Sequence, residues 1–330
     1  MPQILVQDLT KSYRVSEREP GALGALAGLF HRRYRTIEAL KGISFSLERG
    51  ELMGFIGPNG AGKSTTIKIL SGILEPLSGR CEIDGLVPWR DRMRHVARIG
   101  VVFGQRTQLW WDLPVLDGFE LLRDIYNVPA ADYRRTRDAM VALMRLEPLL
   151  DQPVRQLSLG QRMRCEIAAA MLHQPSILFL DEPTIGLDAP SKLAVRDFVK
   201  TLNRERGVTV ILTTHDMHDI EALAQRVIVI GNGVILADQP FDSLRAEVLT
   251  ERRLFVDFAG EAPAIRIPDV AIVHREGNSL ELSFDPAVVA VAEIISRITA
   301  DYELVDIHAE QPRIEEVIAR FYSLHGATEP

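Results

Sequence analysis

Short apolar runs recur along the first 240 residues and predict the strands of a buried sheet. Residues 176–180 and 209–213 have apolar centres, which is typical of parallel strands that are covered on both faces. Residues 226–230 and 234–236 flank Gly231-Asn232-Gly233 and predict a β-hairpin with an Asn-Gly turn. Residues 4–9, 39–47 and 52–56 are the other predicted strands, and the first two indicate a β-rich lobe.

Helical periodicity replaces these strands between residues 116 and 171. Apolar side chains recur there at helical spacing in two runs, which are Leu116, Phe119, Leu121, Leu122 and Ile125, then Met140, Leu143, Met144 and Leu146. We therefore expect a helical subdomain over about residues 105–172. Another helix is predicted at residues 191–204, between two of the buried strands.

The pattern changes again after Pro240. Residues 253–258 and 279–284 alternate like strands with one solvated face, and residues 303–307 also resemble a strand. Residues 288–298 and 314–324 have helical patterns. These elements predict a small α+β domain at residues 241–330, with a core of its own, after a larger domain at residues 1–240.

Residues 15–37 form a predicted insertion in the β-rich lobe. An apolar, glycine-containing stretch at residues 21–30 precedes the basic run Arg32-Arg33-Tyr34-Arg35. An apolar face beside arginines suits a partner or a lipid surface. A solvated loop is an equal alternative, because glycine weakens a helix, and the sequence leaves this point open.

Composition and charge narrow the possible partners. The chain has 330 residues, of which 46% are hydrophobic and 25% charged, as in an ordinary globular protein. A net charge of −7 supplies no basic field, so nucleic acid is not an expected partner. Cys81 and Cys165 lack metal-ligand spacing and are expected to be reduced. The N-terminus does not resemble a signal peptide, and no apolar stretch approaches the roughly 20 residues of a membrane span, so any membrane role needs partner chains.

Residues 57–64 carry the strongest chemical signal in the chain. They have the pattern G-x-x-x-x-G-K-[ST] of a phosphate-binding loop, between a predicted strand and a predicted helix. Backbone N–H groups and the start of the helix would bind a nucleotide triphosphate, ATP in the interpretation below. The lysine would reach the β- and γ-phosphates, and the following serine would offer its hydroxyl to Mg²⁺. The residues assigned to nucleotide binding here are Gly57, Pro58, Asn59, Gly60, Ala61, Gly62, Lys63, Ser64 and Thr65.

Two acidic residues follow the apolar strand 176–180. A carboxylate at the end of a buried strand beside a phosphate-binding loop is typical of Mg²⁺ binding, and we assign this role to Asp181. Glu182 is placed to polarise the attacking water as general base.

Five further features complete a family resemblance. Leu157-Ser158-Leu159-Gly160-Gln161 resembles the LSGGQ signature of ATP-binding cassette (ABC) proteins, and Gly186-Leu187-Asp188 resembles their D-loop. His215, after a buried strand, resembles the switch histidine. Gln105 resembles the Q-loop glutamine, and Tyr13 the aromatic residue that stacks on adenine. The motifs occur in the family's order over residues 1–240.

The resemblance implies a fold and a set of site residues. The fold is an α/β P-loop NTPase of ABC type, with a RecA-like parallel-sheet core, an antiparallel β lobe and a helical signature subdomain, followed here by the small α+β appendage. Two ATP-binding subunits, expected to be a homodimer, would sandwich two ATP molecules. The implied roles are catalysis by Glu182, His215 and Gln105, Mg²⁺ binding by Ser64, Gln105 and Asp181, and nucleotide contacts by Tyr13, Ser158, Gly160, Gln161 and Asp188.

Three features near these motifs affect the assignment. The third signature residue is Leu159 in place of glycine, which is expected to alter packing against the partner but not phosphate contact. Both Gln105 and Gln108 lie in the Q-loop region, and spacing favours Gln105. Trp110 and Trp111 fall where the family meets its membrane subunits, although the alternative is that one of them packs inside the helical subdomain.

The resemblance extends to one bacterial exporter-type subgroup, whose members assist drug or organic-cation efflux. It implies an ATPase motor that works with separate membrane permease subunits at the cytoplasmic face of the membrane. The alternative is a soluble ABC ATPase in macromolecular or cofactor assembly. The single cassette and the acidic charge disfavour a ribosome-acting protein. Glu182 and His215 argue against a third possibility, a nucleotide-binding regulator without turnover.

Overall fold

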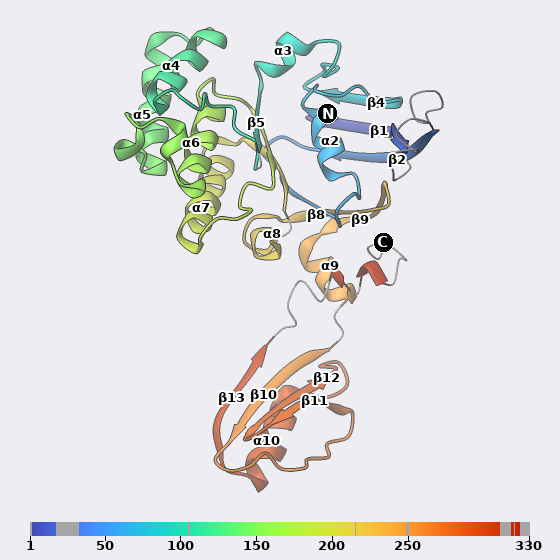
Figure 1. Cartoon of the computed structure of the whole chain (residues 1–330). Helices are drawn as coiled ribbons and strands as arrows, with labels where there is room; N and C mark the ends of the chain where they lie inside the picture. Colours follow the sequence, from blue (N-terminus) through green and yellow to red (C-terminus); the bar gives the residue numbers. More distant parts are fainter. Residues whose placement is uncertain are drawn as a thin grey trace, which may run out of the picture. The chain divides into compact units, whose positions relative to one another are not determined.

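A computed structural model describes residues 2–17, 33–104, 106–214, 216–248, 251–310, 318–319 and 321–323. The chain divides into two compact units, formed mainly by residues 1–240 and by residues 241–328, and each is described by itself (Figure 1). Among the described residues, no helix is long and apolar enough to cross a membrane.

A six-stranded sheet forms the centre of the first unit, with the strand order β5-β6-β7-β3-β8-β9. All neighbouring strands are parallel except β8 and β9, which are antiparallel and are joined at Asn232 and Gly233. The parallel register places Phe103 beside Asp181 and Asp181 beside Thr213, so three strands end together. The strands are β3 (Leu52–Ile56), β5 (Ile99–Phe103), β6 (Ile177–Asp181), β7 (Thr209–Thr213), β8 (Arg226–Gly231) and β9 (Val234–Pro240).

A second sheet is the predicted β lobe. It consists of β1 (Ile4–Glu17), β2 (Arg33–Leu47) and β4 (Ser78–Ile83), in the order β2-β1-β4, and all its pairs are antiparallel. Its core residues pack with those of β3, β6 and helix α2 (Lys63–Leu70) in one hydrophobic cluster. The central sheet is therefore covered on one side by α2 and the β lobe.

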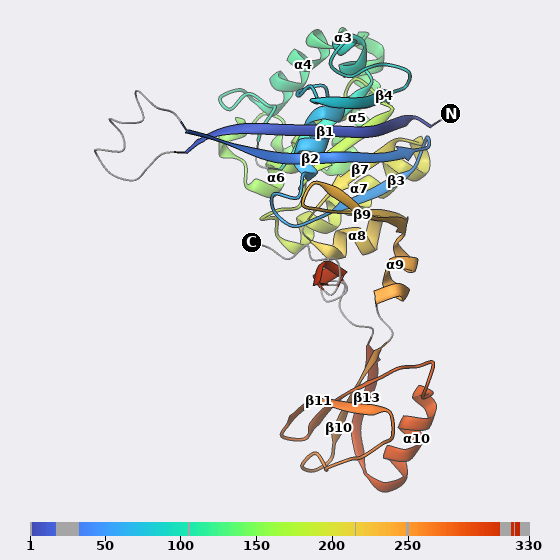
Figure 2. The same ribbon diagram turned by 90° about the vertical axis from the view of Figure 1, so that its right-hand side faces the viewer.

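The ends of the predicted insertion at residues 15–37 belong to the β lobe. Val15 pairs with Arg35 and Glu17 with Arg33, so β1 and β2 continue as a long antiparallel hairpin (Figure 2). The expected start and end of the insertion are therefore wrong, because cross-strand backbone pairing extends past the apolar part of each strand. The apolar stretch 21–30 and Arg32 lie outside the described residues.

The predicted helical subdomain is present as α4 (Val115–Ile125), α5 (Ala130–Met144) and α6 (Leu159–Met171), with α7 (Ala189–Arg206) beside them (Figure 1). Phe119, Met140 and Met144 are buried as the periodicity predicts, whereas Leu121 and Ile125 are exposed. The other helices of this unit are α3 (Arg92–Val96), α8 (Met217–Leu223) and the short turns Glu147–Leu149 and Val154–Gln156.

The second unit contains a four-stranded antiparallel sheet in the order β11-β12-β10-β13. Its own apolar core includes residues of the sheet and of α10, among them Leu254, Phe284 and Ile294. The predicted strands and the first predicted helix are present, but the helix begins at Val291, and α9 and β11 were not predicted. The elements are α9 (Phe241–Val248), β10 (Arg252–Phe258), β11 (Val270–Glu276), β12 (Ser279–Phe284), α10 (Val291–Asp301) and β13 (Leu304–Glu310).

The helix predicted at residues 314–324 is described only at 318–319 and 321–323, which are helical. Its other residues lie outside the described part of the chain.

Removing residues 241–330 is expected to leave the first unit folded, because the hydrophobic cluster around β3 and α2 consists of residues before position 240. Thermal unfolding of the truncated chain, followed by circular dichroism, should give a single cooperative transition. Loss of that transition, with the full-length chain as the control, would show that the two units do not fold independently.

Candidate functional site

The predicted phosphate-binding loop joins β3 to α2, which confirms the strand–loop–helix context. Gly62 caps the helix with φ 115°, a conformation that favours glycine. A Cβ atom at Gly62 would also lie 2.7 Å from the Ala39 carbonyl oxygen of the β lobe. The first N–H groups of a helix have no carbonyl partner within it and carry the positive end of its dipole. The loop therefore presents anion-binding backbone groups.

Lys63 lies inside this loop and is only 5% exposed. Its Nζ atom donates hydrogen bonds to the carbonyl oxygens of Gly57 and Pro58, at 2.5 and 3.0 Å. Burial lowers the pKa of the Lys63 ammonium, and the nearby charges of Glu182 and Asp181 only partly oppose this effect. A phosphate chain would supply the negative charge that this buried ammonium needs.

Asp181 ends β6 and connects three elements of the site. Its Oδ1 atom accepts hydrogen bonds from the hydroxyl of Ser64 at 3.2 Å and from that of Thr213 at 2.6 Å. The residue is 8% exposed. Hydroxyl and carboxylate oxygens are the ligand types that Mg²⁺ prefers, so this donor set fits the ion.

Glu182 follows Asp181 in an unusual backbone conformation. Its φ of 56° lies in the left-handed region, which is uncommon for a residue with a side chain. Its N–H group donates to the backbone oxygen of Thr213 at 2.9 Å. This bond holds the chain at the end of the sheet while it turns away from β6. Strained residues of this kind cluster at functional sites, which supports the predicted importance of Glu182.

Gln105 and His215 lie outside the described residues. Their neighbours mark the same edge of the sheet: Gly104 follows β5 and donates its N–H group to the Asp181 backbone oxygen at 2.8 Å, and Thr214 follows β7.

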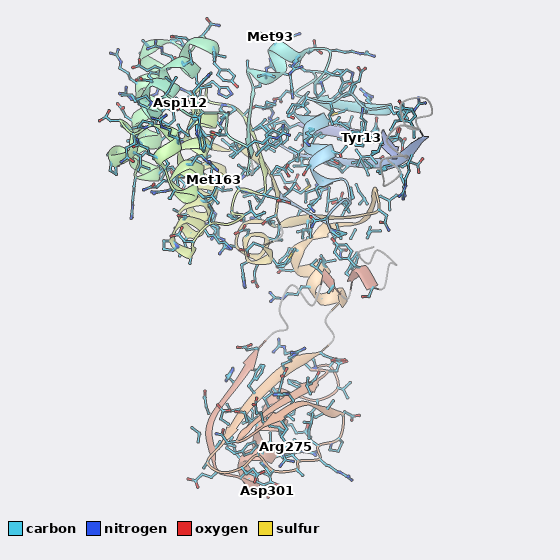
Figure 3. The ribbon with its side chains drawn as sticks, in the orientation of Figure 1. Tyr13, Met93, Asp112, Met163, Arg275 and Asp301 are labelled. Carbon is cyan, nitrogen blue, oxygen red and sulfur yellow. The ribbon has the colours of Figure 1, made fainter. Side chains whose placement is uncertain are left out.

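Tyr13 lies on β1, close to the first turn of α2 (Figure 3). Its hydroxyl lies 3.4 Å from that of Thr65, and the Lys11 ammonium lies 5.8 Å from its ring centroid. The hydroxyl end of Tyr13 therefore lies beside the start of α2, and its role in adenine stacking stays a prediction.

The signature residues form a second group at the start of α6. Ser158 and Gln161 make a capping box, in which each side chain bonds to the other's backbone N–H group, at 3.2 and 2.8 Å. A Cβ atom at Gly160 would lie 2.3 Å from the Ser191 hydroxyl and 3.4 Å from an Asp188 carboxylate oxygen. Glycine thus allows the signature turn to approach the start of α7 closely. In Figure 1, α6 and α7 lie on one side of the unit and α2 on the other.

Leu159, the departure from the signature pattern, packs within its own chain. One of its methyl groups lies 3.0 Å from the position that a Cβ atom would take at Gly186. The side chain is half-buried, and it therefore contributes to the contact between the signature turn and the D-loop.

A buried carboxylate that the sequence analysis missed connects the Q-loop region to α6. Glu166 accepts hydrogen bonds from the N–H groups of Gln108 at 3.1 Å and Leu109 at 3.4 Å, and from the Thr107 hydroxyl. Burial raises the pKa of the Glu166 carboxyl, although these bonds oppose the shift. The Gln108 side chain also donates to the Glu166 backbone oxygen at 2.9 Å. The only local indication of this buried carboxylate was an acidic residue within the otherwise apolar run 165–171.

Both tryptophans of the helical region reach the surface. Trp110 is 38% and Trp111 49% exposed, and the Arg162 guanidinium lies 5.4 Å from the Trp111 ring centroid. Neither ring is buried in the helical subdomain.

Comparison with known proteins identifies the family. A family profile described as ABC transporter matches residues 40–185. A linearmycin resistance ATP-binding protein of Bacillus subtilis is 31% identical over 88% of this chain and 94% of its own length. The chain belongs to the ABC transporter ATP-binding proteins.

Other relatives of this ABC protein differ in length. A daunorubicin resistance ATP-binding protein of Streptomyces coeruleorubidus is 32% identical over 87% of this chain and 92% of its own. ABC transporter A family member 1 of Dictyostelium discoideum is 33% identical over 69% of this chain, which spans only 26% of that protein.

Solved structures of ABC cassettes share the fold. The ATP-binding subunit of an ABC transporter has a TM-score of 0.62 and 25% identity, over 74% of this chain and 92% of its own. A dimeric cassette in a post-hydrolysis state, bound to ADP and Pi, has a TM-score of 0.60 and 28% identity, over 72% of this chain and 98% of its own.

These comparisons confirm the predicted α/β P-loop fold of ABC type and the ATPase activity. The ABC protein is an ATPase subunit of the transporter family, whose cassettes dimerise, and no finding supports the alternative of an assembly factor.

Replacing Lys63 with alanine should weaken ATP binding about 10- to 100-fold, because a charge-assisted hydrogen bond contributes about 1.5–3 kcal/mol. Fluorescent ATP titrated into the full chain measures this affinity. Lys68→Ala, on the same helix, is the matched control and should bind ATP normally. Equal affinity of the two variants would contradict the role of Lys63.

Proposed function

We propose that this ABC protein is the ATP-hydrolysing motor of an exporter and that ATP is bound between two copies of the chain. The separation of two groups of residues carries the proposal. Lys63, Ser64 and Asp181 lie together at the sheet edge, whereas Ser158 and Gly160 lie at the start of α6 on the other side of the unit. A second copy would bring its signature turn to the phosphates of the first.

Within the first group, each side chain has a distinct task. Lys63 and the start of α2 bind the β- and γ-phosphates, and Tyr13 stacks on adenine. Ser64, Asp181 and Gln105 would hold Mg²⁺, which neutralises charge on the phosphates when it is bound. The engagement of Gln108 with Glu166 favours Gln105 as the Q-loop ligand.

The hydrolytic step needs a base and a sensor. Glu182 accepts a proton from the attacking water, and His215 donates a hydrogen bond to the γ-phosphate. In the second group, the hydroxyl of Ser158 and the N–H group of Gly160 bind the γ-phosphate in the opposite subunit. Gln161 and Asp188 complete that surface. Hydrolysis removes the γ-phosphate contacts and allows the two copies to separate.

A homodimer is the simplest arrangement, because each copy of the chain contains both groups of residues and can supply its signature turn to the other copy. The dimeric cassette with ADP and Pi supports this arrangement by analogy. A structural relative belongs to a transporter complex, which supports an association with separate membrane permeases at the cytoplasmic face of the membrane. The exposed Trp110 and Trp111 are suitable anchors for such a contact.

The names of several relatives support export. Two are the resistance proteins above, and a Nod factor export ATP-binding protein of Ralstonia nicotianae is 34% identical over 77% of this chain. A methionine import protein of Enterococcus faecalis is also 31% identical over 85% of this chain. Because the names of the relatives include both directions, the direction is established by measuring transport in membrane vesicles.

Replacing Glu182 with glutamine should reduce kcat at least about 100-fold, because the general base is lost while the side chain keeps its size. ATP binding should persist, and a closed ATP-bound dimer should accumulate in size-exclusion chromatography. Glu205→Gln, an exposed residue of α7, is the control. Turnover at the wild-type rate would show that another group is the base.

Replacing both Trp110 and Trp111 with alanine should abolish co-purification with a membrane protein, since two anchors of an interface would be removed. The tagged chain is isolated from membranes of its own cells, and bound proteins are identified by mass spectrometry. ATP affinity should not change, and Val305→Ala, exposed in the second unit, should retain the partner. A wild-type chain that never retains a membrane protein would contradict the transporter role.

A further inference from the structure

Four charged side chains form a cluster between α7 and the start of α8. Asp219 is fully buried, and its Oδ1 atom accepts a hydrogen bond from Arg196 Nε at 2.5 Å. Asp216 forms ion pairs with Lys192 at 2.5 Å and with Arg196 at 3.5 Å. We call Lys192, Arg196, Asp216 and Asp219 the α7–α8 charge cluster. Its two positive and two negative charges balance, and of the four only Asp219 is fully buried.

Asp219 also binds the loops that follow β6 and β7. The second oxygen of Asp219, Oδ2, accepts hydrogen bonds from the hydroxyls of Thr184 and Thr214, the latter at 3.1 Å. Thr184 follows Glu182 by two residues, and Thr214 directly precedes His215. One carboxylate thus holds the segments that carry the proposed base and the proposed γ-phosphate sensor.

Both sequence neighbours of His215 belong to this arrangement. The Thr214 hydroxyl accepts a hydrogen bond from the Asp216 N–H group at 2.9 Å. Asp216 in turn caps α8 through the N–H group of His218 at 3.1 Å. Burial alone would raise the pKa of the Asp216 carboxyl, but the hydrogen bond and charge of Lys192, together with the charge of Arg196, outweigh this effect and lower the pKa below its usual value.

Helix α7 extends this network toward the signature turn. Lys192 and Arg196 lie in its first two turns, and Ser191, in its first turn, lies against Gly160. The same helix therefore binds Asp216 and Asp219, which hold the loops of one ATP half-site, and contacts the signature turn that serves the other.

We infer that Asp219 is a positioning residue, which orients His215 and Glu182 through Thr214 and Thr184 and anchors them to α7. The inference rests on the proposed roles of Glu182 and His215. The arrangement would transmit loss of the γ-phosphate at one half-site to the signature turn that serves the other.

The test measures steady-state ATPase kinetics and thermal unfolding of full-length variants. Thr214→Val removes only the hydroxyl, at nearly constant volume, and should lower kcat about tenfold while KM changes less than about twofold. Thr214→Ser restores a hydroxyl and should recover most of the activity. Asp219→Asn should behave like Thr214→Val, and Asp197→Asn, on the exposed side of α7, is the matched control.

A second measurement separates positioning from stability. In a His215→Ala background, Thr214→Val should lower kcat by less than about twofold further, because residues that act as a unit are not additive. An undiminished loss there, or equal activity of Thr214→Val and Thr214→Ser, would overturn the inference. If His215→Ala has no measurable turnover, the comparison of Thr214→Val with Thr214→Ser decides it. Wild-type kcat of His215→Ala would instead refute the proposed role of His215, and the inference with it.

A third readout tests the link through α7. In the Glu182→Gln background, Thr214→Val should raise the ATP concentration for half-maximal dimerisation about tenfold, whereas Thr214→Ser should leave it unchanged. The same concentration for both variants would show that the cluster does not act on the signature turn.

Discussion

The hydrogen bonds to one carboxylate oxygen of Asp181 set the geometry where β3, β6 and β7 end. A buried carboxylate needs donors, and here they come from Ser64 on α2 and Thr213 on β7. Both contacts require that β6 lie beside β7 in parallel register and that β3 deliver its loop to the same edge. The position of Lys63 beside Asp181 and Glu182 follows from this arrangement, as does the electrostatic field that a triphosphate would enter.

The helical side of the first unit is held to this edge by buried polar contacts. Glu166 fixes the chain after the Q-loop to α6, and the α7–α8 charge cluster fixes the loops around Glu182 and His215 to α7. The two helices meet where Gly160 lies against Ser191. Buried polar networks of this kind are specific in geometry, because a misplaced donor leaves a carboxylate unsatisfied. They join the β6 and β7 ends of the sheet to α6 and α7 through specific contacts.

Most of the elements and the main motifs were predictable, but most of the side-chain partners were not. The octet ending in Ser64 and the pair Asp181-Glu182 are local patterns with a chemical meaning. Thr213 ends a predicted strand, yet nothing local indicates that its hydroxyl binds Asp181, which lies 32 residues away. Glu166 stands out locally only as an acidic residue in an apolar run, and nothing local indicates the donors of Glu166 or Asp219, because these lie on other segments. The extent of β1 and β2 was also missed, since cross-strand pairing and not apolar content carries the hairpin onward.

The sequence by itself determined the local conformations: helix and strand periods, the Asn232-Gly233 turn, the glycines of the phosphate-binding loop and the change of pattern after Pro240. These follow from the dihedral preferences and solvent exposure of neighbouring residues. Only the tertiary structure decided the strand order, the packing of Leu159 on Gly186 and the pairing of Asp219 with Thr214 and Arg196. These contacts join residues on separate elements, and their energies depend on register and burial, which no local pattern records.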